Sequence, residues 1–203
     1  AAMGKTYDGN ASATLINQGA VMTGIEGETL TVSTAGTFND KNAGARQVNT
    51  TSTLGNGTGG LASNYTLTNA TNAVDATITQ KALTVIGIAA MGKTYNGNTS
   101  ATLSNQGSVV TGIMGETLTV STSGMFNDKN AGARKVNTTT TIANNGNTLA
   151  SNYSLTNANN VVDATIAQKA VSVSGIVANG KTYDGNTMAT LSGRKMAFMR
   201  RLV

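Results

Sequence analysis

The residues best suited to chemistry lie in a hexapeptide that occurs three times. Lys5–Asn10 reads KTYDGN, Lys93–Asn98 reads KTYNGN, and Lys181–Asn186 reads KTYDGN again. A tyrosine and a carboxylate beside a lysine could serve in acid–base catalysis or metal binding. The middle hexapeptide has Asn96 where the first has Asp8, so a site that needs the carboxylate would be lost there.

A turn explains the hexapeptide better than a catalytic site does. A type I′ hairpin turn needs positive φ at both central residues, and Asn-Gly serves as well as Asp-Gly. The tyrosine would then pack in the core beside the turn, and the lysine would lie along the strand edge. We therefore predict structural turns at three tripeptides: Tyr7, Asp8 and Gly9; Tyr95, Asn96 and Gly97; and Tyr183, Asp184 and Gly185.

Two further segments are weak candidates for calcium binding. Asp40 and Asn42, like Asp128 and Asn130, belong to an Asp-x-Asn-x-Gly pattern that resembles part of a calcium loop. Both segments lack the glutamate that closes an EF-hand loop, and short oxygen-rich matches of this kind often form turns. We expect no bound cofactor.

The composition excludes most hydrolytic and zinc chemistry. The chain has no histidine and no cysteine, so it can form neither a Ser-His or Cys-His nucleophile nor a zinc site with nitrogen or sulfur ligands. A glycoside hydrolase would need paired carboxylates. Glu26 and Glu28 form such a pair, but Met114 replaces Glu26 in the second repeat. We expect the protein not to be an enzyme.

The net charge of +5 does not indicate a nucleic-acid-binding face. The tail that follows residue 193 contains four of the basic residues, Arg194, Lys195, Arg200 and Arg201, and no acid. Nucleic-acid binding needs basic residues clustered on one surface, and the rest of the chain offers only scattered ones. No apolar run is long enough to span a membrane.

A long internal repeat organises the chain. Residues 1–80 align without a gap to residues 89–168 and are identical at 60 of 80 positions, with a period of 88 residues. We predict a first repeat at 1–80 that lacks its first strand, a complete second repeat at 81–168, the start of a third at 169–193, and an unrelated basic tail at 194–203. The differences are densest at 51–60 and 139–148, which hold 7 of the 20 and which we predict to be variable loops.

Alternating apolar and small polar residues within each repeat predict β-strands. ETLTVST at 28–34, NYTL at 64–67 and AVDATIT at 73–79 alternate in this way, and turn-rich segments separate them. The fold class predicted is all-β: tandem Ig-like, antiparallel β-sandwich domains in a rod, with a β-grasp-like repeat or a β-solenoid as the alternative. Strand alternation on both sides of Gln168 predicts that one repeat passes into the next without a linker.

The segments KTYDGN, FNDKNAG, SNYTLTNA and DATITQKALTV together resemble the YDG-type repeat of large secreted bacterial adhesins of the filamentous haemagglutinin kind, which is similar to MBG repeats. The likeness covers residues 1–193. Such repeats often have a proline before the KAL strand, where this chain has Gln80 and Gln168. The resemblance implies an extracellular or bacterial cell-surface location and a stalk or adhesive role.

The expected function is a non-enzymatic stalk or adhesion segment whose partners are neighbouring repeats, copies of itself, or host or cell-surface glycans and proteins. The strand KAVSVSGI at 169–176 has no domain to complete, and the first repeat lacks the equivalent strand. Strand donation between chains would fill both and give head-to-tail assembly. The alternative is a glycan- or protein-binding module that uses the loops at 51–60 and 139–148.

Overall fold

The computed structural model describes residues 1–192, and its contacts divide the chain into two compact units. Ala1–Ala167 forms the larger unit and Gln168–Val203 the smaller. The larger unit holds the first repeat and nearly all of the second. Strands dominate the described residues, and the helical segments among them are two three-residue 3-10 helices. The predicted all-β class is confirmed. The tail predicted at 194–203 lies outside the described residues.

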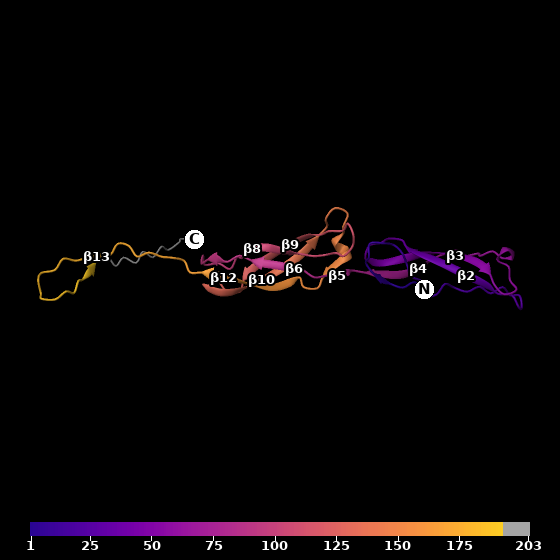
Figure 1. The fold of residues 1–203 in the computed structure, drawn as a ribbon, viewed down its shortest axis with the longest axis horizontal. Coiled ribbons are helices and arrows are strands. Elements are labelled where there is room, and N and C mark those ends of the chain that lie inside the picture. Colours follow the sequence, from indigo (N-terminus) through magenta and orange to yellow (C-terminus); the bar gives the residue numbers. More distant parts are fainter. Residues whose placement is uncertain (193–203) are drawn as a thin grey trace, which may run out of the picture. The chain divides into compact units, whose positions relative to one another are not determined.

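The first repeat contains one four-stranded sheet with the strand order β1-β4-β3-β2. Its elements are β1 (Lys5–Thr6), β2 (Leu30–Phe38), β3 (Gly44–Asn56), the 3-10 helix η1 (Ala62–Asn64) and β4 (Thr71–Thr79). Figure 1 shows β2, β3 and β4 as neighbours in the purple part of the ribbon. Partly buried and exposed residues alternate along β2 up to the buried Phe38, as expected for a strand with one face on the core.

The second repeat has the same kind of sheet, with the order β7-β12-β10-β9, and adds two strand pairs, β6-β8 and β5-β11. Its elements are β5 (Lys81–Leu83), β6 (Ile86–Ala90), β7 (Lys93–Thr94), β8 (Leu103–Ser108), β9 (Thr119–Phe126), β10 (Gly132–Ala143), the 3-10 helix η2 (Ala150–Asn152), β11 (Tyr153–Leu155) and β12 (Asn159–Ala167).

The hairpin β6-β8 covers one face of the second sheet. The segment between its strands reaches both edges of that sheet, because β7 pairs with β12 and Ser100 bridges to Met125 of β9. Phe126, Val136 and Ile166 form the buried core beneath it, each at most 3% exposed. The two layers thus enclose a thin apolar core, and the KTYNGN hexapeptide lies where the hairpin joins the sheet.

The sheets are mixed, which corrects the antiparallel arrangement predicted from the sequence. β1 runs parallel to β4, β7 runs parallel to β12, and β5 runs parallel to β11. Alternation of apolar residues identifies a strand but carries no information about the direction of its neighbour. Each parallel pair includes a strand of only two or three residues. Contacts between segments far apart in the repeat set the direction of these short strands.

The segments 51–60 and 139–148, predicted to be loops, are mostly strand. β3 continues to Asn56 and β10 continues to Ala143, so only the last four or five residues of each segment form the connection. Thr51 to Leu54 alternate between exposed and partly buried, and threonine favours strands. Sequence variation here marks an extended hairpin with a short variable tip.

The junctions between repeats differ from each other. At the first, Gln80 alone separates β4 from β5, as the missing linker predicts. At the second, every residue of Lys169–Ile176 is exposed and the segment forms no strand, contrary to the prediction. The smaller unit contains only the pair β13 (Val177–Ala178) and β14 (Leu191–Ser192) among its described residues. A strand needs a partner for its backbone groups, and no strand within residues 1–192 pairs with Lys169–Ile176.

Candidate functional site: the joint between the repeats

The lysine of each hexapeptide holds its own loop together. Lys5 Nζ donates to Asp8 Oδ1 at 2.8 Å, to Asn10 O at 2.8 Å and to Asn10 Oδ1 at 2.9 Å. The same ammonium lies 5.5 Å from the centre of the Phe38 ring. Partial burial of Asp8 acts against ionisation, but the hydrogen bonds from Lys5 and Asn10 and the positive charge of Lys5 together outweigh it and lower the pKa of Asp8. The contacts define a local staple.

This staple does not depend on the carboxylate. In the second hexapeptide Lys93 Nζ donates to Asn98 O and Asn98 Oδ1, both at 2.8 Å, and to Ser100 O at 3.0 Å, with no bond to Asn96. The third hexapeptide, which has no core around it, repeats the pattern of the first, with 2.7 Å from Lys181 to Asp184. The hexapeptide is therefore a locally determined loop.

The predicted type I′ turn is wrong in its backbone geometry. Gly9 and Gly97 have φ of 83° and Gly185 has 73°, but among residues 1–192 no residue other than glycine has positive φ. The Asp8 carboxylate instead accepts the Asn10 N–H at 3.1 Å, which is an Asx turn. The chain does not double back here: Thr6 pairs with β4, whereas Ser12 bridges to β2.

The tyrosines of the three hexapeptides have different surroundings. Tyr7 is buried, Tyr95 is partly buried against the second core, and Tyr183 is 94% exposed. The prediction that all three pack in a core is therefore wrong for Tyr183. The three hexapeptide loops have similar internal hydrogen bonds, so the burial of each tyrosine depends on the residues that surround the loop.

Tyr7 is buried because it enters a joint with the second repeat. Its hydroxyl donates to Glu116 Oε1 at 2.7 Å, and the Tyr153 hydroxyl donates to Glu116 Oε2 at 2.5 Å. The two rings meet edge to face, with centroids 5.4 Å apart and an interplanar angle of 80°. Each carboxylate oxygen thus accepts a hydroxyl from a different repeat, which is a charge-assisted arrangement.

The joint keeps both tyrosines protonated at pH values where an ordinary tyrosine would ionise. Burial, followed by the hydrogen bond to Glu116, raises the pKa of Tyr7 to about 12. The same two causes raise the pKa of Tyr153. These hydroxyls are poor proton donors for catalysis and good permanent hydrogen-bond donors. The arrangement therefore suits adhesion between repeats rather than acid–base chemistry.

A second contact connects the loop after β2 to η2. Asn152, which is 1% exposed, accepts the Ala43 N–H on Oδ1 at 2.9 Å and donates from Nδ2 to Asn42 Oδ1 at 2.9 Å. Gln80 Nε2 adds a bond to Ser151 O at 3.0 Å. A buried amide that is satisfied only by the other repeat ties the two together, because separation would leave it unpaired.

The aspartates predicted as weak calcium ligands instead stabilise two equivalent loops, one after β2 and one after β9. Asp40 Oδ2 lies 3.2 Å from Arg46, and Asp128 Oδ2 lies 3.3 Å from Arg134. Asp40 Oδ1 also accepts the Asn42 N–H at 2.9 Å. A guanidinium thus lies where a bound cation would be needed. Among residues 1–192, no cluster of three acidic, histidine or cysteine side chains could hold a metal ion.

Sequence reasoning missed the central residues of the joint, Glu116, Asn152 and Tyr153. Each has an identical counterpart in the first repeat, Glu28, Asn64 and Tyr65 respectively. The pair Glu26 and Glu28 does not recur in the second repeat, which argues against a catalytic pair but hides the fact that Glu28 alone does recur. The signal for the joint is that this glutamate recurs together with an Asn-Tyr pair.

The fold and the joint define an all-β protein with two similar domains in direct contact. Residues 1–73 and 79–160 each match the model of the YDG domain, so the chain belongs to the YDG domain family. Searches of curated proteins and of solved structures found no match. Across residues 1–192, helices long and apolar enough to cross a membrane are absent.

Proposed function

We propose that this chain is a non-enzymatic structural segment of a bacterial cell-surface or secreted adhesin, whose YDG domains form a stalk and assemble head to tail. The joint is the observation that supports this most directly. Glu116 binds hydroxyls of Tyr7 and Tyr153, so bending at this point would expose two hydroxyls and a carboxylate that now satisfy one another. A joint of this kind can transmit load between domains.

The engagement of the acids supports a non-enzymatic role. Asp40 pairs with Arg46, Glu116 accepts two tyrosine hydroxyls, and Glu28 accepts the Tyr65 hydroxyl at 2.5 Å. Each of the three carboxylates thus already has a hydrogen-bonding or charged partner, whereas hydrolysis requires one that is free to act as general base or nucleophile. Their arrangement is that of structural groups.

Solution scattering of the full chain and two variants tests the stalk. Glu116→Ala removes the acceptor at the joint, and Glu28→Ala removes its counterpart at the uncovered end of the first repeat. We expect a narrow distribution of maximum dimensions for the wild type and for Glu28→Ala, and a broader one for Glu116→Ala. A wild-type distribution as broad as that of Glu116→Ala would contradict the proposal.

A binding module remains a second candidate because of a groove at the joint. The tip Asn145–Thr148 lines it together with Asp8, Gly9 and Lys41, so a variable segment lies beside side chains of the other repeat. Loops carried on a rigid scaffold commonly form binding surfaces. The ligand would be a surface glycan or protein.

Exchange of the variable tips separates the two candidates. Asn145–Thr148 is replaced by the equivalent Gly57–Gly60, and the reverse exchange at 57–60 is the matched control. Binding of each full chain to a glycan array is then compared with the wild type. A loss specific to the exchange at 145–148 favours the binding module, and unchanged binding favours the stalk.

A further inference from the structure

In the second repeat, the segment Lys81–Ile88 fills a groove between two strands. β5 pairs in parallel with β11, with Leu83 opposite Leu155, and β6 pairs with β8. Leu83 and Val85 are each 4% exposed. This segment therefore supplies both backbone pairing and two apolar side chains to the domain that follows it.

An asparagine clamps the middle of the filled groove. Asn157 Oδ1 accepts the Val85 N–H at 2.7 Å, and Asn157 Nδ2 donates to Val85 O at 2.9 Å. Asn160 Nδ2 holds the clamp from behind by donating to Asn157 O at 2.7 Å. The side-chain amide acts as a neighbouring strand would, by satisfying both backbone groups of Val85.

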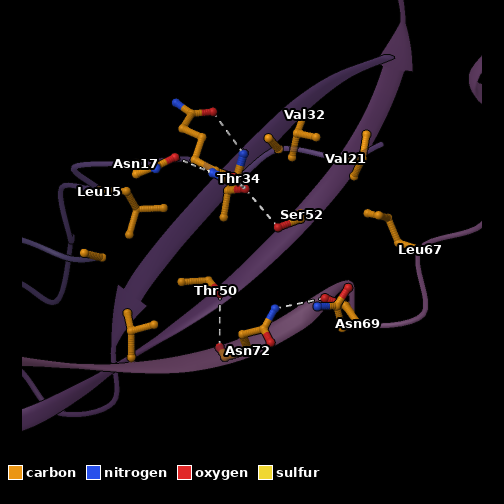
Figure 2. Close-up of a pocket in the computed structure, with 15 residues that line it drawn as sticks. Leu15, Asn17, Val21, Val32, Thr34, Thr50, Ser52, Leu67, Asn69 and Asn72 are labelled. Atoms are coloured by element: carbon orange, nitrogen blue, oxygen red, sulfur yellow. Dashed lines mark hydrogen bonds between the residues drawn. The ribbon is translucent and has the colours of Figure 1, made fainter. Parts of the chain in front are cut away.

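The first repeat has the same groove, and no described segment fills it. Val21, Val32, Ser52, Leu67 and Asn69 are among the residues around a cavity of about 310 Å³, which we call the acceptor groove (Figure 2). It corresponds to the place that Lys81–Ile88 occupies in the second repeat.

A pair of equivalent glycines marks the difference between the filled and the open groove. A Cβ on Gly107 would lie 2.8 Å from Val85 Cγ1, whereas a Cβ on Gly19 would meet nothing within 4 Å. Tyr153–Leu155 is a strand, and the equivalent Tyr65–Leu67 is not.

The clamp of the acceptor groove is already in place. Asn72 Nδ2 donates to Asn69 O at 2.9 Å, just as Asn160 does to Asn157 (Figure 2). Within residues 1–192 the Asn69 side chain makes no hydrogen bond. Its amide is therefore free to take the backbone N–H and C=O of an incoming strand.

The chain also carries a segment that resembles Lys81–Ile88. Lys169–Ile176 reads KAVSVSGI, against KALTVIGI at Lys81–Ile88. Val171 and Val173 stand at the positions of Leu83 and Val85, and they are 89% and 81% exposed. Gly175 has φ of 73°, close to the 78° of Gly87. The segment has the bend and the apolar pattern that the groove fits.

We propose that the acceptor groove of the first repeat binds the Lys169–Ile176 strand of a second copy of this chain. Val171 and Val173 enter the groove as Leu83 and Val85 enter the second repeat, and Asn69 clamps the backbone of Val173. The inference rests on the head-to-tail assembly of the proposed function and names its site. Donor and acceptor are different segments of the chain, so the contact is heterologous, and an open-ended series of such contacts gives chains of molecules.

The rest of the joint has counterparts that would meet in the same contact. The donor molecule brings Tyr95, the equivalent of Tyr7, close to Glu28 and Tyr65 of the acceptor, the equivalents of Glu116 and Tyr153. Tyr95, Glu28 and Tyr65 are only partly buried, and Asn64, the counterpart of the buried Asn152, is exposed. The contact between molecules would then repeat the contact within one.

Charge substitutions on the two faces of the donor strand test the site. Val173→Asp would place a carboxylate in the groove, whereas Ser172→Asp places the same charge at the position of the exposed Thr84. Sedimentation velocity of the full chains over a range of concentrations should show association for the wild type and Ser172→Asp. For Val173→Asp the association constant should fall at least about a hundredfold. Equal effects of the two substitutions, or a wild type that stays monomeric at every concentration, would overturn the proposal.

A peptide of sequence KAVSVSGI with blocked ends tests the groove independently of the donor. Native mass spectrometry of the Val173→Asp chain should show one peptide bound per chain, and Asn69→Ala on that chain should weaken binding at least about tenfold. Asn159→Ala, a strand residue away from the groove, is the control. Absence of peptide binding would overturn the site, whatever the scattering result. If the peptide binds but solution scattering shows that the repeats move freely, the acceptor groove is supported as a binding site and the stalk proposal is contradicted.

Discussion

The joint and the uncovered end of the first repeat present the same residues in two conditions. Glu116, Asn152 and Tyr153 are closed over by the first repeat, and Asn152 and Tyr153 are at most 3% exposed. Their counterparts at the uncovered end keep the local bond from Tyr65 to Glu28 at 2.5 Å but gain no partner from another repeat. The difference shows that Asn152 and Tyr153 are buried where another repeat covers them, and that their counterparts Asn64 and Tyr65 stay more exposed.

The largest contrast is expected between Glu116→Ala and Glu28→Ala. Loss of Glu116 leaves two buried tyrosine hydroxyls without an acceptor, which should lower the free energy of unfolding by about 2–4 kcal/mol. Glu28→Ala leaves one partly exposed hydroxyl that water can reach, at a cost below about 1 kcal/mol. Urea unfolding followed by circular dichroism measures both, and equal losses would contradict the contrast.

The next contrast compares Asn152→Ala with Asn64→Ala. Removal of the Asn152 amide leaves the Ala43 N–H and the Asn42 amide without their partner at the joint, so we expect a loss of about 2 kcal/mol. Asn64 is exposed and should be nearly neutral, within about 0.5 kcal/mol. The same urea experiment applies, and a loss of similar size at Asn64 would show that the asparagine acts within its own repeat.

Gly9 and Gly97 share a φ of 83° but differ in what lies beside them. A Cβ on Gly9 would lie 3.0 Å from Ile113 Cγ2 of the other repeat, whereas one on Gly97 would meet nothing within 4 Å. Alanine at either position should cost about 1–2 kcal/mol through backbone strain. Gly9→Ala should cost more by several tenths of a kcal/mol, measured as a difference in melting temperature. A larger loss for Gly97→Ala would contradict this order.

The tyrosines of the joint should make stability fall at high pH. The pKa of Tyr7 in the folded state is raised to about 12 from the ordinary 10.0. Between these values the unfolded chain has lost the proton and the folded chain keeps it, so the contribution of Tyr7 is complete below pH 10 and is lost as pH rises toward 12. Urea unfolding across this range should show a shallower decline for Tyr7→Phe than for the wild type. Tyr183→Phe, at an exposed position, should leave the decline unchanged.

The smallest effect is expected for Asp8→Asn, which converts the first hexapeptide to the sequence of the second. Asp8 has a side chain that is 46% exposed, and exposed ion pairs contribute little. The loss at pH 7 should stay below about 1 kcal/mol. Because the pKa of Asp8 is lowered, the contribution is present above its ordinary pKa and disappears on acidification. Damage equal to that of Gly9→Val would restore a specific role for the carboxylate.

The sequence predicted the strands better than it predicted the joint. Apolar alternation located β2 and β4, because one face of each strand lies on the core. It failed at Tyr65–Leu67 and Lys169–Ile176, where the pattern is present but residues 1–192 supply no partner strand, and a strand needs a partner for its backbone groups. The ends of β3 and β10 were predicted to be loops because the two repeats differ in sequence there. Sequence variation in an exposed hairpin resembles variation in a loop.

The joint escaped prediction for a related reason. Tyr7 and Glu116 are far apart in the sequence and belong to different positions of the repeat, so no spacing within one repeat connects them. The recurrence of Glu28, Asn64 and Tyr65 as Glu116, Asn152 and Tyr153 shows that these positions are alike. It does not reveal that one set meets a neighbour and the other does not.

Hydrogen exchange of the full chain, followed by mass spectrometry, tests the central claim most directly. The claim is that the joint couples the two YDG domains into one cooperative unit. Peptides from β3 and from β10 should then open with the same free energy in the wild type and with separate free energies in Glu116→Ala. Glu28→Ala should behave as the wild type does. If β3 and β10 open independently in the wild type, the joint does not couple the domains and the account is contradicted.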